Sequence, residues 1–343
     1  MISGLTGLFS IRRQPGLPPN TALYLEACNS LSGRKAFGPV VKADLFFRWL
    51  TVFCAAVVIL LVAGIILELV SQSWPSIKQF GFGFLISRDW NPVTGQFGAA
   101  SSIYGTLITT VIAMLLAGPA AIVIALFLVE LAPPKVSRIV GTGIELLAAI
   151  PSIIYGMWGL FVFAPFMADY VQPALAKIAP NSPLFQGPPM GIGILSAGII
   201  LAIMVLPFIC AVSREVLLMV PAVVKEAAYG MGGTTWEVTR QVSLRYGVHG
   251  ILGAMFLGLG RAVGETMAVT FVIGNNHSIS ASLFSAGNSI PSTLANEFTE
   301  ASEPLYLSAL IELGLVLMVM TFVFQIIAHL WLKSVRKKTG GGL

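Results

Sequence analysis

Six long apolar runs constrain the fold of this chain most strongly. They cover approximately residues 46–71, 103–132, 139–166, 190–213, 248–275 and 304–332. Each run is long enough to cross a hydrocarbon core of about 30 Å as an α-helix. Inside lipid every backbone amide and carbonyl needs an internal hydrogen-bond partner, which a helix supplies. We therefore expect an all-α integral membrane protein with six transmembrane helices.

The composition leads to the same class. Of 343 residues, 56% are hydrophobic and only 10% are charged, with a mean hydropathy of +0.87. Soluble domains usually contain about 25% charged residues. Cys28, Cys54 and Cys210 show no CxxC or metal-site spacing, and no GxxxxGK[ST] phosphate loop occurs. We therefore expect no metal and no bound ATP on this chain, so any ATP-driven work would need a partner that hydrolyses it.

The distribution of basic residues predicts the orientation. If the N-terminus is inside, 16 of the 20 Lys and Arg residues fall on inner segments. The outer segments hold Lys78, Arg88 and Lys177, and Arg261 lies within the membrane. This asymmetry places both termini in the cytoplasm. The net charge of +5 thus reflects membrane topology, and nucleic-acid binding is not expected.

The chain divides around these helices. We expect a cytoplasmic tail at 1–44, a first transmembrane helix at 45–72, a periplasmic segment at 73–102, a five-helix core domain at 103–333 and a basic cytoplasmic tail at 334–343. Within the core, residues 214–247 form a polar, helix-compatible cytoplasmic loop. Residues 167–189 contain five prolines and are expected to be a connection that does not span.

Charged side chains inside the apolar runs are candidates for function. Arg261 and Glu265 stand four residues apart, so a continuous helix over 258–275 places them on one face. An ionised side chain at mid-bilayer costs about 2.5–3.5 kcal/mol, so such residues neutralise each other, meet water or handle a charged cargo. Glu312, about 12 Å into the last helix, is a candidate second partner for Arg261. Glu145 is either a pore residue or a partner for Arg138.

Two further membrane acids have a simpler interpretation. Glu68 and Glu130 lie near the ends of their helices. A carboxylate there reaches the polar interface easily, so we expect both to be solvated without a role in transport.

The cytoplasmic segment 226–245 carries a spaced motif. Glu226-Ala227-Ala228, Gly232, Val242 and Leu244 match the EAA loop of ABC importer permeases. Such a segment forms a short helix, a turn that glycine permits and a second helix, which can seat in a groove of a soluble ATPase. The alternative is an ordinary amphipathic loop. The family's closing proline is replaced by Arg245.

A closer resemblance covers about residues 46–332. GLGRAVGETMAVTFVIGN (258–275), ELLAAIPSIIYGMWGLFVFAP (145–165), EAAYGMGGTTWEV (226–238) and NSIPSTLANEF (288–298) resemble the PstC-type permeases of phosphate ABC importers. The resemblance implies a MetI-like (type I importer) bundle in the bacterial inner membrane. It also implies a heterodimer with a PstA-type permease, a dimer of ATPase subunits that bind ATP and magnesium, and a periplasmic phosphate-binding protein.

The resemblance assigns roles to particular residues. Arg261 and Glu265 correspond to the residues tied to phosphate passage. Glu226, Ala227, Ala228, Gly232 and Trp236 are expected at the interface with the ATPase.

Three other functions are considered. A sulfate or molybdate permease differs only in its anion, which the residues do not decide on physical grounds. A proton-coupled carrier using Glu265 or Glu312 has no use for an ATPase-docking segment. A purely structural scaffold leaves Arg261 and Glu265 without an energetic reason.

Overall fold

A computed structural model of the chain describes residues 38–338. The predicted tails at 1–44 and 334–343 therefore lie largely outside the described residues. The chain divides into two units at Ile65 and Ile66, and each unit is treated by itself. The described part of the first unit is one helical stretch, which is the N-terminal part of α2. The second unit contains every other element.

The described residues are helical throughout, apart from loops and one isolated bridge between Asn91 and Gln96. The α-helices are α2 (Gly38–Phe80), α3 (Gly83–Ile86), α4 (Ala100–Leu126), α5 (Pro134–Ala148), α6 (Ser152–Trp158), α7 (Ala164–Phe166), α8 (Gln172–Ile178), α9 (Ile194–Leu218), α10 (Ala222–Gly230), α11 (Thr235–Val238), α12 (Leu244–Val263), α13 (Met267–Ile273), α14 (Ile290–Glu297) and α15 (Pro304–Lys338). Helical turns of π type cover Phe127–Leu131, Gly159–Phe163, Met167–Val171 and Thr239–Ser243, and a 3₁₀ turn covers Pro183–Phe185.

Six stretches of the described chain are long and apolar enough to cross a membrane. They are Asp44–Phe80, Ala100–Leu131, Ser152–Ile178, Ile194–Leu218, Thr235–Val263 and Pro304–Ser334. The prediction of an all-α membrane protein with six spans is confirmed.

Small residues allow the central helices to pack closely. Ala113, Ala117, Ala121 and Ala125 recur every fourth residue on α4 and are fully buried, and α4 packs along α9. On α9, a Cβ added at Gly198 would lie 2.7 Å from Cγ2 of Ile112. Close backbone approach through small residues is the usual way in which membrane helices associate. Helix α12 packs on both α4 and α9 and so completes the core.

Two of the predicted spans are displaced along the chain. The run at 139–166 is interrupted because Pro151 adopts an extended conformation and begins α6, which leaves α5 as a separate amphipathic helix. The helix then continues to Ile178, through residues expected to form a connection. The predicted helix over 248–275 is also wrong as one piece, since α12 ends at Val263 and α13 begins at Met267.

The first helix also runs beyond its predicted end at residue 72. Helix α2 continues to Phe80, and its last turns join α15. The Ser76 amide donates to Oγ of Ser308 at 3.1 Å, and that hydroxyl donates to the Gln72 carbonyl at 2.8 Å. Part of the predicted periplasmic segment is thus an extension of the first helix.

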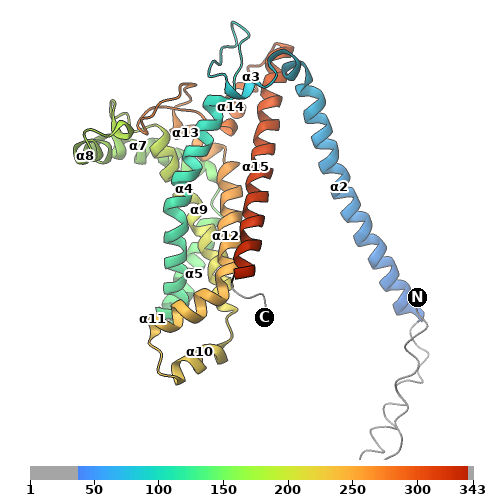
Figure 1. Cartoon of the computed structure of the whole chain (residues 1–343), viewed down its shortest axis with the longest axis vertical. Coiled ribbons are helices and arrows are strands. Elements are labelled where there is room, and N and C mark those ends of the chain that lie inside the picture. Colours follow the sequence, from blue (N-terminus) through green and yellow to red (C-terminus); the bar gives the residue numbers. More distant parts are fainter. Residues whose placement is uncertain (1–37, 339–343) are drawn as a thin grey trace, which may run out of the picture. The chain divides into compact units, whose positions relative to one another are not determined.

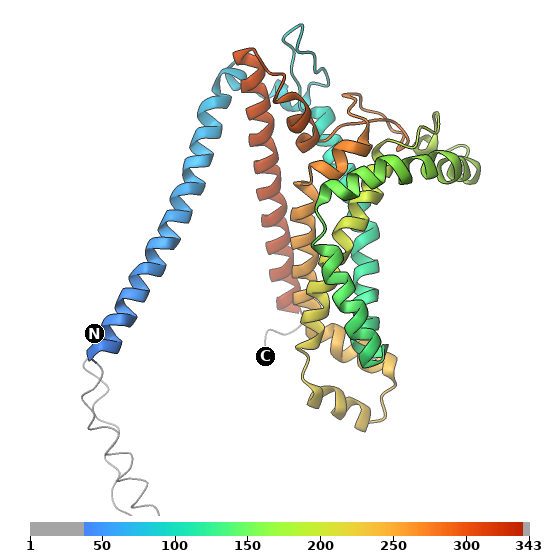
Figure 2. The same cartoon turned by 180° about the vertical axis from the view of Figure 1, so that it is seen from behind.

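Within the second unit, the short elements gather at opposite ends of the long helices. Figures 1 and 2 show α10 and α11 beyond one end of α9 and α12, and α3 and α14 at the other. A second apolar core lies at the α14 end, where Phe84, Phe97, Ile290, Tyr306 and Leu310 are buried together. The loop at 226–240 and the loop at 280–300 therefore lie on opposite sides of the helical core.

Candidate functional site

Arg261 and Glu265 lie on either side of a break in the membrane helix. Arg261 is in the last turn of α12, and the chain leaves the helix at Gly264, Glu265 and Thr266 before α13 begins. The prediction that a continuous helix aligns the two side chains is therefore wrong. Among the described residues, the two side chains do not form an ion pair with each other.

The Arg261 guanidinium is exposed on the surface of this chain. Its Cζ lies 5.8 Å from the centroid of the Phe208 ring on α9. Within the described part of the chain, no carboxylate is paired with it. A cation also suits the C-terminal end of a helix, where backbone carbonyls carry partial negative charge. Helix α12 thus presents, beside α9, a guanidinium whose hydrogen-bond donors are available to an anion.

Glu265 belongs structurally to the following helix. Its Oε1 accepts a hydrogen bond from the Ala268 amide of α13 at 3.2 Å. Helix α13 packs tightly on α6, because a Cβ added at Gly156 would lie 2.9 Å from the Met267 carbonyl oxygen. Glu265 is therefore bonded to α13, which packs on α6, whereas Arg261 is carried by α12.

Glu312 lies in a different environment from Arg261. It is 6% exposed and lines a pocket formed by α2, α3, α4 and α15. The ion pairs of the described residues join Arg214 to Glu145 and Glu215, and Lys225 to Glu130, while His277 lies within hydrogen-bond distance of Glu297. The suggested pairing of Glu312 with Arg261 is not observed.

The segment predicted to meet an ATPase folds as a helix, a turn and a second helix. Glu226 and Ala227 are exposed on α10, and Ala228 is half-buried. Gly232 has φ +86°, a left-handed conformation that favours glycine. Thr234 then forms a capping box with Glu237 at the start of α11, which carries Trp236 at 67% exposure.

The departure of the sequence from the EAA motif leaves this geometry intact. Arg245, in place of the family's proline, lies in the first turn of α12, directly after the π-type turn at Thr239–Ser243. The segment predicted to meet the ATPase, residues 222–243, is called the coupling segment. From its π-type turn the chain passes in helical conformation into α12, the helix that carries Arg261.

Two ion pairs secure the same end of the helical core. Nζ of Lys225 on α10 lies 2.7 Å from Oε1 of Glu130, whose side chain is only 5% exposed. Glu130 is thus a buried partner and not the solvated interfacial acid that we expected. Nη1 of Arg214 lies 3.6 Å from Oε1 of Glu145, which pairs with α9 and not with Arg138.

A half-buried polar cluster at the opposite end was not foreseen. Glu297 accepts hydrogen bonds from the Trp90 indole and from the Tyr306 hydroxyl, the latter at 2.8 Å, and lies 2.8 Å from Nε2 of His277. His277 stacks on Trp90, and its Nδ1 lies 2.7 Å from Nδ2 of Asn288. The cluster joins the loop before α4 to α14 and α15. The described residues contain no group of three or more His, Cys, Asp or Glu placed to hold a metal ion.

Comparison with known proteins identifies the family. The profile of the family described as "Binding-protein-dependent transport system inner membrane component" matches residues 117–337. A "Phosphate transport system permease protein PstC" of Mesorhizobium japonicum is 52% identical over 301 residues, covering 87% of this chain and 92% of that protein. The chain belongs to the PstC family of binding-protein-dependent transport permeases. The protein of the same name from Pasteurella multocida is also 52% identical, covering 87% of the permease and 94% of its relative.

Solved structures agree on the fold. The permease resembles a chain of a bacterial alginate ABC transporter in complex with its oligosaccharide-bound periplasmic protein. The TM-score is 0.57 at 17% identity, covering 90% of the permease and all of that chain. A chain of the MetNI methionine ABC transporter gives a TM-score of 0.53 at 19% identity, covering 68% and 94%. The MetI-like fold is confirmed, and neither a proton-coupled carrier nor a sulfate or molybdate permease is favoured.

Proposed function

We propose that the permease lines the path of inorganic phosphate through the bacterial inner membrane, in an importer driven by ATP hydrolysis on a separate ATPase dimer. A PstA-type permease completes the path, and a periplasmic phosphate-binding protein delivers the anion. The observation that carries the proposal is the exposed Arg261 guanidinium on a membrane helix, with no carboxylate paired to it among the described residues. The printed names of the relatives support phosphate as the cargo.

Arg261 attracts the anion, and Glu265 tunes its release. The planar guanidinium offers paired N–H donors that match phosphate oxygens. A fixed cation alone would hold phosphate too tightly, and a nearby carboxylate competes for the same donors. Phosphate keeps a proton at neutral pH and can donate it in a hydrogen bond to Glu265, whereas fully ionised sulfate has no such donor.

The break between α12 and α13 allows the release of phosphate to be controlled by helix movement. Arg261 is on α12, which continues from the coupling segment, and Glu265 caps α13 against α6. A displacement of α12 by the ATPase changes the separation between the guanidinium and the carboxylate. The path thus alternates between a state in which Arg261 binds phosphate and one in which Glu265 displaces it.

Neutral substitutions test these roles. Arg261→Gln and Glu265→Gln should each abolish phosphate uptake in membrane vesicles while the assembled transporter still co-purifies. The matched control is Arg138→Gln, which removes an exposed arginine at the start of α5 and should leave uptake unchanged. If Arg261 and Glu265 only neutralised each other for membrane insertion, the double neutral variant would transport normally. Normal uptake in that variant would overturn the proposal.

The coupling segment docks on the ATPase through its exposed apolar side chains. Met231 is 85% exposed and Tyr229 is 42% exposed, beside Trp236 in the same segment. A solvent-facing cluster of this kind is typical of a protein interface. Docking on the ATPase requires that α10 and α11 face the cytoplasm, the side on which we also place both termini. ATP with magnesium is bound by the ATPase subunits alone.

A further inference from the structure

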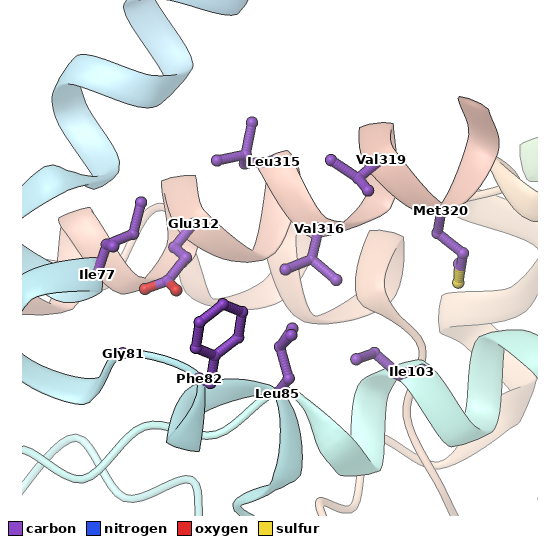
Figure 3. A pocket seen from close by; sticks show the side chains of 10 residues that line it. All are labelled: Ile77, Gly81, Phe82, Leu85, Ile103, Glu312, Leu315, Val316, Val319 and Met320. Carbon is purple, nitrogen blue, oxygen red and sulfur yellow. The ribbon is translucent and has the colours of Figure 1, made fainter. Parts of the chain in front are cut away.

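A pocket at the α3 end of α15 is unrelated to the Arg261 site. It has a volume of about 420 Å³ and is lined by ten residues of α2, the following turn, α3, α4 and α15. Figure 3 shows apolar side chains along its length, among them Ile77, Phe82, Leu85 and Val316. Small-molecule sites have volumes of about 300–1,000 Å³ and are mostly apolar, with a few polar groups that orient the ligand.

One carboxyl group interrupts this apolar lining. Glu312 is 6% exposed, and in Figure 3 its carboxylate oxygens point toward Ile77 and Phe82 at one end of the pocket. Its buried Oε2 has no hydrogen-bond partner among the described residues. Buried polar side-chain atoms are nearly always hydrogen-bonded, so an unpartnered carboxyl facing a pocket indicates a missing donor.

A second unpartnered polar atom lies beside it. The Ser76 side chain of α2 interacts with the Glu312 carboxyl. Its buried Oγ has no partner that satisfies hydrogen-bond geometry within the described chain, although its backbone amide is bound by Ser308. The polar end of the pocket thus offers a carboxyl group, which accepts hydrogen bonds, and a hydroxyl group, which can accept them and can donate one.

The other end of the pocket suits a hydrocarbon chain. Val319 and Met320 line it, seven and eight residues beyond Glu312 on α15, or about 11–12 Å along the helix. Phe82 and Val319 are 87% and 52% exposed, so the pocket is open along its side. An elongated molecule with one polar end can therefore enter sideways and lie along α15.

We propose that this pocket binds a membrane amphiphile whose polar end donates hydrogen bonds, as an ammonium or a hydroxyl group does. The donor meets Glu312 and Ser76, and the alkyl chain lies along Val316, Val319 and Met320. A fatty acid is disfavoured, because its carboxylate would face the Glu312 carboxyl. Lipid chains alone fill the apolar end but bring no further donor to the buried Oε2 of Glu312.

Photolabelling with three matched probes tests the proposal. The probes share one alkyl chain with a diazirine at its end and differ in their head group: an amine, an alcohol or a carboxylic acid. They are applied to the assembled transporter in lipid nanodiscs, and labelled residues are mapped by mass spectrometry. The amine and the alcohol should label Val319 and Met320 about tenfold more than the acid, the factor expected for a hydrogen bond to a charged group.

Variants separate the polar end from the apolar wall. Glu312→Gln should lower labelling by the amine about tenfold and labelling by the alcohol to a smaller extent, because the amide oxygen still accepts a hydrogen bond but carries no charge. Val319→Trp, which fills the pocket away from the carboxyl, should reduce labelling by both. Glu68→Gln removes an exposed acid of α2 outside the pocket and should change nothing. Val319→Trp remains decisive if Glu312→Gln does not assemble.

Two results would overturn the proposal. Equal labelling by all three probes, unchanged in Glu312→Gln, would mean that the pocket contacts lipid chains without recognising a head group. Labelling of the isolated chain but not of the assembled transporter would mean that the partner permease fills the pocket.

Discussion

We predict that the ion pair between Lys225 and Glu130 holds α10, the first helix of the proposed coupling segment, against the helical core. The Nζ–Oε1 distance is 2.7 Å, and the side chains are 19% and 5% exposed. Removing one partner of a buried ion pair costs about 3–5 kcal/mol, because the other charge is left buried and unpaired. Lys225→Met leaves Glu130 in that state. The freed α10 should therefore open more often, by roughly a hundredfold to a few thousandfold.

The opposite substitution should cost far less. In Glu130→Gln the lysine remains, and its flexible, partly exposed side chain can turn its ammonium toward water. The loss is then about 1 kcal/mol, or roughly a fivefold increase in opening. The asymmetry between the two variants is the signature of a pair in which only the carboxylate is deeply buried.

Hydrogen–deuterium exchange of residues 222–230 measures this opening. It is best followed in membranes that contain both permeases but no ATPase, whose docking would shield the same amides. Lys135→Met, at an exposed lysine in the first turn of α5, is the matched control. Equal exchange in the two pair variants, or wild-type exchange in Lys225→Met, would show that the pair does not hold α10.

Three further predictions concern topology, the coupling turn and the helix contact at α13. In a background without native cysteines, single cysteines within 226–240 should be shielded from an impermeant external reagent while those within 280–300 react; the reverse pattern would refute the orientation. Gly232→Ala should weaken ATPase co-purification by roughly tenfold, because a left-handed conformation costs a residue with Cβ about 1–2 kcal/mol, whereas Gly230→Ala should not. Gly156→Ala should destabilise the permease by about 1–3 kcal/mol and impair uptake, because the new methyl group meets the α13 backbone. Gly253→Ala is the control and should do neither, because its methyl group meets no atom within 4 Å. Thermal unfolding in detergent and uptake by vesicles measure the last pair.

The sequence predicts those features that depend on local pattern. Apolar length gives six spans because the bilayer fixes how many residues a helix needs. The spacing of Glu226, Gly232 and Leu244 gives the helix–turn–helix coupling segment, because the turn requires a residue that tolerates positive φ. The tail at 1–37 lies outside the described residues, and the assignments of Arg261 and Glu265 remain predictions.

The features that sequence reasoning missed depend on tertiary contact. A glycine within an apolar run is compatible with an unbroken helix, so Gly264 did not reveal the break between Arg261 and Glu265. Glu130 and Lys225 are 95 residues apart. Only the packing of the helical core places them together, so the sequence alone suggested that Glu130 was a solvated acid at the end of a span. Counting residues along α15 gave Glu312 a depth in the membrane close to that of Glu265. It did not give the side of α15 on which Glu312 lies, which is the pocket with α2, α3 and α4 and not the side of Arg261.

If α10 docks on the ATPase as proposed, it transmits force by two routes, and the pair of Lys225 and Glu130 provides one of them. Helix α10 is joined covalently to α11 and α12, and its ion pair joins it to the end of α4, which packs with α12 against α9. In Lys225→Met the covalent route toward Arg261 persists, so ATP hydrolysis should continue. Part of the displacement is no longer shared with α4, and phosphate uptake per ATP hydrolysed should fall. Exchanging the charges with Lys225→Glu and Glu130→Lys should restore the ratio, and a parallel loss of both activities in Lys225→Met would mean that the pair serves assembly alone.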